Sequence, residues 1–231
     1  MSSKELSSLQ KSLGYQFKDP DLLALALRHR SAGKHNNERL EFLGDAILGL
    51  VIAETLYRRF PHASEGQMSR MRSYLVKGKT LAKVALQFDL GNYLYLGAGE
   101  MKSGGHRRES ILADTVEAIL GAVYLESGKD AVELRIADWF EELLDHVDPD
   151  TIDKDPKTRL QEWLQARQLA LPTYEVVKTS GEAHNQTFWV ACHIIDKNGT
   201  KLTTDTQSKS RQQGEKAAAE LMLTKLIAGL T

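Results

Sequence analysis

The spacing of apolar and polar residues divides the chain into two regions. From residue 3 to about residue 147, apolar positions recur every three or four residues, which is the period of amphipathic helices. Beyond residue 156 the pattern changes, and apolar residues take every second position at Phe188, Val190, Cys192 and Ile194. This alternation predicts a half-buried strand, so the two regions are expected to differ in fold class.

Local signals mark the helices of the first region. Asp19 precedes a proline, as is typical of an N-cap with proline in the first turn. Pro61 is expected to end one helix, and Ser64 opens a capping-box sequence at the next. The helix before Pro61 is expected to take its cap from Asn36 or Asn37. The predicted helices cover residues 21–29, 37–59, 65–77, 80–88, 108–127 and 130–147, with a glycine-rich loop over 97–106.

A polar segment with two prolines, residues 148–156, indicates a linker because it cannot bury apolar area. The predicted domains are a helical domain over 1–147, this linker, and a second domain over 157–231. The second domain is expected to hold a helix, three strands and a closing helix, over residues 158–167, 173–178, 188–194, 201–206 and 211–227. The predicted fold class is an all-α N-terminal domain followed by an α+β domain of order α-β-β-β-α.

Composition limits the classes of protein that the chain can belong to. With 231 residues and 42% apolar content, it can form one large or two small cores. A single cysteine, Cys192, excludes an internal disulfide framework and fits a reducing cytosol. Without a run of 18 apolar residues or an apolar signal core, we expect no membrane partner and a cytoplasmic location. The net charge of −1 means that a nucleic-acid binder of this composition must concentrate its basic groups locally.

Acidic residues recur on the faces of two predicted helices. Glu38, Glu41 and Asp45 are three and four residues apart, so they share one face of the helix over 37–59. Asp114 and Glu117 share a face of the helix over 108–127 in the same way. Both faces border apolar positions that we expect in the core. Carboxylates beside a core are unfavourable unless another group compensates their charge.

Two interpretations of these carboxylates follow. They can be ligands of Mg²⁺, which prefers oxygen donors, and such a site suits phosphodiester hydrolysis. No histidine or cysteine lies near them in sequence, which argues against zinc. Alternatively they are solvated, as is usual for helical acids, or paired with nearby arginines, namely Arg39, Arg107 and Arg108. The spacing alone favours this second interpretation.

Polar residues of the second domain suit double-stranded RNA. Gln161 and Gln165 are four residues apart and can face a minor groove, while His184 lies in a predicted hairpin turn. Cations flank the start of the last predicted helix, where backbone N–H groups also favour phosphate, at Lys209, Arg211 and Lys216. Each residue alone is most simply a surface group, but the order of the elements favours RNA binding.

Four segments resemble bacterial ribonuclease III. Residues 37–45 (NERLEFLGD) closely match its signature, and residues 108–118 (RESILADTVEA) resemble its second catalytic helix. Residues 155–165 and 181–184 resemble its C-terminal double-stranded-RNA-binding domain. The resemblance extends over essentially the whole chain, and it favours the metal-site interpretation of the acidic residues.

The resemblance implies roles for individual residues. Glu41, Asp45, Asp114 and Glu117 would be the metal ligands, and Asp45 and Glu117 would be the catalytic ones. Glu38 and Glu65 would be supporting acidic or dimer residues, and Phe42 would insert into a pocket of the partner subunit. The RNA-binding residues would be Thr158, Gln161, Glu162, Gln165, His184, Lys209, Arg211 and Lys216.

The resemblance also implies an activity. The expected enzyme is a homodimeric endoribonuclease that cuts double-stranded RNA with Mg²⁺, for which Mn²⁺ can substitute, by two-metal-ion catalysis. Products would carry 5′-phosphate and 3′-hydroxyl ends, and substrates would include ribosomal RNA precursors and messenger RNAs. The alternatives are a double-stranded-RNA-binding protein without catalysis and a purely structural helical dimer. The set of acids argues against the first, and the second domain argues against the other.

One segment departs from the family pattern. Gln212 and Gln213 stand where adjacent cations are expected, and Gly214 replaces a better helix former at a cost of about 1 kcal/mol. We therefore expect weaker and less salt-sensitive phosphate binding than in a typical member, because each phosphate that the protein does not neutralise lowers the salt slope by nearly one unit.

Overall fold

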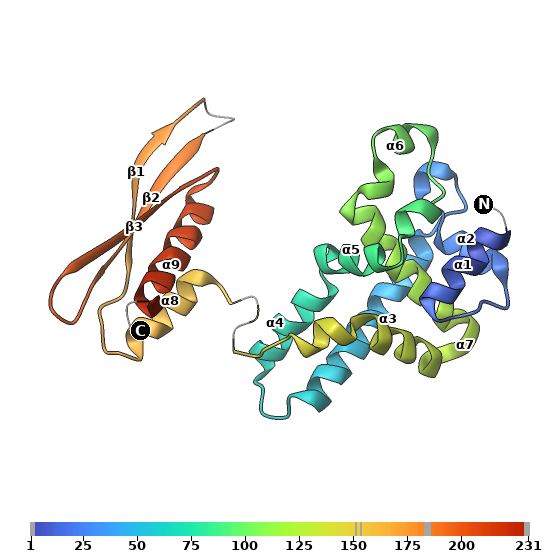
Figure 1. Ribbon diagram of the computed structural model, residues 1–231, viewed down its shortest axis with the longest axis horizontal. Helices are drawn as coiled ribbons and strands as arrows, with labels where there is room; N and C mark the ends of the chain where they lie inside the picture. Colours follow the sequence, from blue (N-terminus) through green and yellow to red (C-terminus); the bar gives the residue numbers. More distant parts are fainter. Residues whose placement is uncertain (1–2, 151, 153, 183–185, 229–231) are drawn as a thin grey trace. The chain divides into compact units, whose positions relative to one another are not determined.

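The chain folds into two compact units, and the division between them falls between residues 153 and 154. The computed structural model describes residues 3–150, 152, 154–182 and 186–228. The first unit is helical, and the second joins a three-stranded sheet to two helices (Figure 1). The predicted fold class, an all-α domain followed by an α+β domain, is confirmed. Among the described residues, no helix combines the length and the hydropathy required to cross a bilayer.

Seven α-helices form the described part of the first unit. They are α1 (Ser3–Leu13), α2 (Pro20–Ala26), α3 (Glu38–Arg59), α4 (Glu65–Val76), α5 (Gly78–Gln87), α6 (Ala98–Lys102) and α7 (Glu109–Asp145). Three 3₁₀ turns lie between them: η1 (Arg30–Ala32), η2 (Leu90–Tyr93) and η3 (Gly105–Arg107). The caps predicted at Asp19 and Ser64 are present. The segment 97–106 is not a plain loop, because it contains α6 and the start of η3.

The two asparagines before α3 have different roles. The Asn36 side chain accepts a hydrogen bond from the Glu38 backbone N–H at 3.1 Å, so Asn36 caps the helix. Asn37 is buried, and its side chain instead donates to the Ala26 carbonyl at 3.1 Å. The Asn37 backbone N–H donates to the Arg28 carbonyl at 2.8 Å. The start of α3 is therefore tied to the end of α2.

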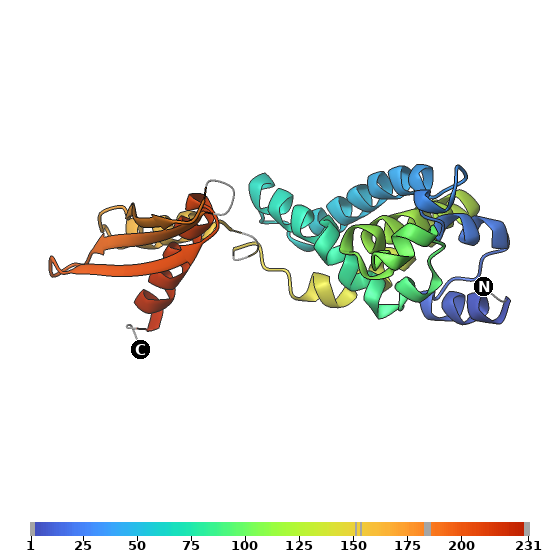
Figure 2. The ribbon, with the colours of Figure 1, turned by 90° about the horizontal axis from the view of Figure 1, so that it is seen from above.

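Helix α7 runs through the centre of the first unit. Nearly every side chain between Ile111 and Val123 is buried, because α2, α3 and α5 pack around this part of the helix (Figures 1 and 2). A helix that is apolar on all sides is stable only in such a position. Gly128 has a φ of +76°, which interrupts α7 at the predicted break. The Trp139 indole then donates to the Leu13 carbonyl at 3.1 Å and fixes the end of α1.

The second unit places two helices on one face of an antiparallel sheet. Its elements are α8 (Pro156–Gln165), β1 (Thr173–Ser180), β2 (Thr187–Ile195), β3 (Lys201–Ser208) and α9 (Arg211–Ala228), with strand order β1-β2-β3. Cys192 lies in the middle of β2, opposite Tyr174 and Thr204, and is fully buried against the helices. The cysteine is therefore a core residue, as its place in the alternation predicts.

Gly214 in α9 is required by packing. It is buried, and a Cβ atom at this position would lie 2.6 Å from Cγ2 of Val190 on β2. The Thr206 hydroxyl also donates to the Gly214 carbonyl at 3.0 Å. The glycine thus allows α9 to approach the sheet closely, which offsets its poor helix propensity.

Candidate active site and nucleic-acid interface

Two glycines allow α3 and α7 to cross at backbone contact. A Cβ atom on Gly44 would lie 1.8 Å from the Glu117 carbonyl oxygen, and a Cβ atom on Gly121 would lie 2.3 Å from the Leu40 carbonyl oxygen. No larger side chain fits at either position unless the helices move apart. This close crossing brings the acidic face of α3 against the acidic face of α7.

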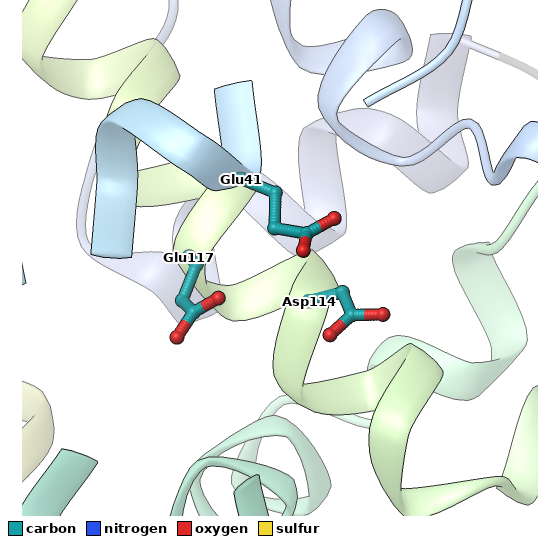
Figure 3. A group of neighbouring side chains, drawn as sticks. All are labelled: Glu41, Asp114 and Glu117. Carbon is teal, nitrogen blue, oxygen red and sulfur yellow. The ribbon is translucent and has the colours of Figure 1, made fainter. Parts of the chain in front are cut away.

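Three carboxylates meet where the helices cross. Glu41 from α3 and Asp114 and Glu117 from α7 each offer an oxygen, and these oxygens lie within 4.8 Å of one another (Figure 3). All three residues are half-buried. Asp45, one turn further along α3, is exposed and is not part of this group of three. An all-oxygen donor set of this kind fits a hard divalent cation such as Mg²⁺.

The electrostatics of the group favour a bound cation. Burial raises the pKa of Glu117 to about 8, and the charges of Asp45, Asp114 and Glu41 act in the same direction. Burial is also the largest cause of the raised pKa values of Glu41 and Asp114. Carboxylates that repel one another beside an apolar core are destabilising, and a divalent ion would relieve that repulsion.

The structure does not support pairing of these acids with arginine. Within the described residues, neither lysine nor arginine forms an ion pair with Glu41, Asp114 or Glu117. Arg108, which the sequence offered as a partner, instead pairs with Glu100 at 2.8 Å. The arginine-pairing interpretation is therefore wrong for the group of three.

A cleft of about 380 Å³ lies beside two of the three carboxylates. Glu41 and Asp114 line it, together with four residues that the sequence patterns did not single out as site residues: His29, Arg30, Glu100 and Ser110. The charges of His29 and Arg30 lower the pKa of Asp114, which opposes the effect of burial. The lining of the cleft therefore combines acidic groups with basic ones.

Tertiary contacts hold the segment that contains His29 and Arg30 in place. The His29 backbone N–H donates to the Tyr95 carbonyl at 3.1 Å. The Ser31 hydroxyl accepts from the Gly97 backbone N–H at 2.9 Å. These bonds join the end of α2 to the segment before α6. No sequence signal marks the pairing, because the two segments are far apart in the chain and neither is periodic.

Of the residues predicted to support the site or the dimer, Glu38 lies at the cleft, whereas Glu65 and Phe42 do not line it. Glu38 lines the same cleft, is exposed, and pairs with Arg30 at 3.7 Å. Glu65 is exposed in the first turn of α4, where it accepts a hydrogen bond from Ser69. Phe42 is 79% exposed on α3. Glu65 and Phe42 are therefore not brought into the carboxylate group.

In the second unit, the predicted RNA-binding residues of α8 share one face. Spacings of three and four residues align Thr158, Gln161, Glu162 and Gln165. Gln161 is half-buried, and the other three are exposed. Glu162 forms an ion pair with Lys154. His184 lies outside the described residues.

The predicted cations gather at the start of α9. Lys209 precedes the helix and is exposed. Arg211 pairs with Glu215 at 2.8 Å, and Lys216 pairs with Asp155 at 2.7 Å. Gln212 and Gln213 are exposed in the same first turn. The sequence patterns did not predict that two of these cations are held by carboxylates.

Family comparisons match both units. Residues 19–143 match the Ribonuclease-III-like family, and residues 156–226 match the double-stranded RNA binding motif. The chain is 56% identical over 218 residues to Ribonuclease 3 of Photobacterium profundum, which covers 94% of this chain and 96% of that protein. Ribonuclease 3 of Hahella chejuensis is 54% identical over 222 residues, with 96% and 97% covered.

Solved structures match the helical unit. The nuclease domain of ribonuclease III from Campylobacter jejuni superposes with a TM-score of 0.60 at 42% identity, covering 63% of this chain and 99% of that domain. A second structure of that domain, which concerns flexibility in a region involved in dimer formation, gives a TM-score of 0.59 at 43% identity and covers 59% of this chain and 96% of that one.

Proposed function

The chain belongs to the ribonuclease III family and is a ribonuclease, and from this membership we propose that it hydrolyses phosphodiester bonds of double-stranded RNA with divalent cations. The main support for the proposal is the grouping of Glu41, Asp114 and Glu117, whose carboxylate oxygens lie within 4.8 Å of one another. A protein that only binds RNA gains nothing from mutually repelling carboxylates placed toward a polyanion.

The proposed ligands are Glu41, Asp45, Asp114 and Glu117, and the proposed ion is Mg²⁺ with Mn²⁺ as a substitute. The set fits because all its donors are oxygens and the three grouped carboxylates have no cationic partner in the described residues. Four carboxylates are enough to coordinate two ions, so the proposal extends to two-metal-ion catalysis. When bound, the cations supply a water of lowered pKa and positive charge for the departing oxygen.

The protein's own residues prepare this site. Glu117 must lose its proton to act as a ligand, and its pKa of about 8 means that cation binding releases that proton at neutral pH. Arg30 and Arg108 line the cleft and offset the negative charge of an entering phosphate. The proposed products carry 5′-phosphate and 3′-hydroxyl ends.

The second unit is proposed to hold the duplex. The face of α8 that bears Gln161 and Gln165 suits the wide minor groove of A-form RNA, where 2′-hydroxyls are displayed. The cations at the start of α9 suit the phosphates between successive grooves. Ribosomal RNA precursors and structured messenger RNAs are the proposed substrates, because they contain extended duplexes.

Dimerisation is proposed through an apolar stripe on α3. Phe42, Leu50 and Tyr57 are 79%, 59% and 71% exposed, and each lies about two turns after the one before it, on the same side of the helix. Large apolar side chains left exposed along one side of a helix are typical of a protein–protein interface. A symmetric dimer through this stripe would carry two cleavage sites, one for each strand.

Two variants test the site. We expect Glu117→Gln and Asp45→Asn to bind duplex RNA as the parent does, because neither changes the second unit. We expect both to lose more than about 100-fold in cleavage rate, since even the outer partners of metal ligands account for about 10–100-fold. Glu141→Gln, an exposed change on the same α7 helix, is the matched control. Cleavage by either variant near the parent rate in saturating Mg²⁺ would show that the ligand assignment is wrong.

A further inference from the structure

A largely covered carboxylate joins the two helices that present the cations of the second unit. Glu215 on α9 is only 12% exposed. Its Oε2 atom accepts a hydrogen bond from Lys157 of α8 at 2.7 Å, and its Oε1 atom accepts one from Nε of Arg211 at 2.8 Å. One carboxylate therefore fixes one cation from each helix.

Both cations keep part of their surface in solvent, with 36% of the Lys157 side chain exposed. The Arg211 side chain is 66% exposed, and its bond to Glu215 uses Nε, which leaves the terminal guanidinium nitrogens for another acceptor. Lys157 is further held over the ring of Tyr174, with its Nζ 4.5 Å from the ring centroid. Both side chains thus have partners within the protein when no ligand is bound.

A second carboxylate extends the same arrangement. One oxygen of Asp155 caps α8 by accepting from the Lys157 backbone N–H at 2.9 Å, and the other pairs with Lys216 of α9 at 2.7 Å. The result is three cations and two carboxylates, with a net charge of +1, at the point where α8 and α9 both begin. The hydrogen bonds from Lys157 and Arg211 lower the pKa of Glu215, so the carboxylate stays ionised.

We propose that Glu215 is a positioning residue for RNA binding, which holds Lys157 and Arg211 in the geometry that receives backbone phosphates. This proposal rests on the proposed function, because it assigns a role within the same RNA-binding surface. Long basic side chains lose conformational freedom when they bind, and a cation that is already ordered loses less.

A carboxylate near phosphates could act in the opposite way, by competing with them for the cations. The two roles differ in the sign of their effect. A competing Glu215 would weaken binding, so its neutralisation would tighten RNA binding and steepen the salt dependence. A positioning Glu215 strengthens binding, so its neutralisation weakens RNA binding although the protein becomes more positive.

The test measures binding of a perfect RNA duplex of about 20 base pairs, which exceeds the about 16 base pairs that such domains span. Binding is measured with the full chain in EDTA, where cleavage is not expected, over a series of salt concentrations. We expect Glu215→Gln to bind about five- to tenfold more weakly, since two side chains lose their ordering. The salt slope should also fall by about one unit for each phosphate that the variant no longer neutralises.

Glu220→Gln is the matched control. Glu220 lies on the same helix and pairs with Arg159 of α8 at 3.0 Å, so this variant removes the same charge and also breaks one ion pair between the helices. We expect its affinity to equal or slightly exceed that of the parent. Equal weakening in both variants would overturn the proposal, because it would indicate a structural role for ion pairs in general.

Arg211→Lys keeps the proposal testable if Glu215→Gln does not fold. This exposed change preserves charge but removes the Nε atom and the guanidinium fork, so we expect about threefold weaker binding. Suppose that the parent binds the duplex, and that Glu215→Gln or Arg211→Lys binds it equally well or more tightly. This result would overturn the positioning role but not the proposed function. A parent that does not bind the duplex would instead contradict the proposed function.

Discussion

Glu117 is the residue whose chemistry depends most strongly on its neighbours. Its helix is buried on nearly all sides, and the carboxylates of Glu41 and Asp114 lie against it. The same side chain on a solvated helix would titrate near 4.5. The raised pKa thus follows from the crossing of α3 and α7.

This shift predicts a pH-dependent stability in the metal-free protein. Below pH 4.5 Glu117 is protonated in both states and contributes nothing. As pH rises from 4.5 to about 8, the unfolded chain loses this proton first, so the folded state becomes less stable. Glu117→Gln removes this penalty, and we expect the variant to be more stable at pH 8 by about 1–2 kcal/mol, a value lowered for partial solvent access.

Urea unfolding in EDTA at pH 5 and pH 8 measures the effect. The two proteins should have similar stability at pH 5 and diverge at pH 8, while a shallower dependence remains from Glu41 and Asp114. Parallel pH profiles for parent and variant would mean that Glu117 does not titrate as described.

At the residue scale, helical spacing predicts which acids share a face but not which faces meet. It places Glu41 beside Asp45 and Asp114 beside Glu117. The grouping of Glu41 with Asp114 and Glu117 depends on the glycines at the crossing, whose role requires knowledge of what faces them. The contributions of Arg30 and Glu100 to the cleft arise from tertiary contacts, so no local pattern marks them.

At the scale of elements, the crossing of α3 and α7 determines the site. Gly44 and Gly121 remove the side chains that would separate the two helices. A local pattern does not distinguish such a glycine from a weak point in a helix. The glycine-rich segment 97–106 shows the reverse case, because α6 forms there even though its composition favours a loop. Its helix is held by tertiary contacts, including the ion pair of Glu100 with Arg108.

Gly44→Ala tests the crossing. The added methyl group would lie 1.8 Å from the Glu117 carbonyl oxygen, so the helices must move apart. We expect a decrease of at least about 2 kcal/mol in the free energy of unfolding, within the range for overpacked cores. We also expect a smaller Mg²⁺-dependent rise in melting temperature, because Glu41 moves away from the α7 carboxylates.

Gly99→Ala in α6 is the control, because nothing lies within 4 Å of its added Cβ atom. It should leave stability within about 1 kcal/mol of the parent, in the direction that alanine propensity favours. A Gly44→Ala protein that is as stable as the parent and retains its full response to Mg²⁺ would argue against the role of close helix contact.

At the scale of the whole molecule, the change of period near residue 156 is sufficient to predict two units of different fold class. The division at residues 153 and 154 lies within the polar segment that was expected to be a linker. Pairing of two chains is less visible in the sequence, because the exposed apolar residues of α3 resemble core positions until the packing of α3 is known.

Phe42→Glu tests the proposed dimer. A charge buried within an apolar contact is unfavourable, so we expect a monomer by light scattering at concentrations where the parent is a dimer. Leu86→Glu, which alters a 63% exposed leucine on α5, should remain dimeric. A parent protein that is monomeric at micromolar concentration, or a Phe42→Glu variant that stays dimeric, would contradict the proposed interface.

The proposed activity can be tested by a cleavage assay on a long perfect RNA duplex and on its separate strands. Each substrate is incubated with the full chain in Mg²⁺ and in EDTA. We expect cleavage of the duplex in Mg²⁺ and none in EDTA, with the single strands left intact. Binding of the duplex without cleavage in Mg²⁺ would contradict the proposed endoribonuclease activity. It would leave the carboxylates of Glu41, Asp114 and Glu117 without a catalytic role.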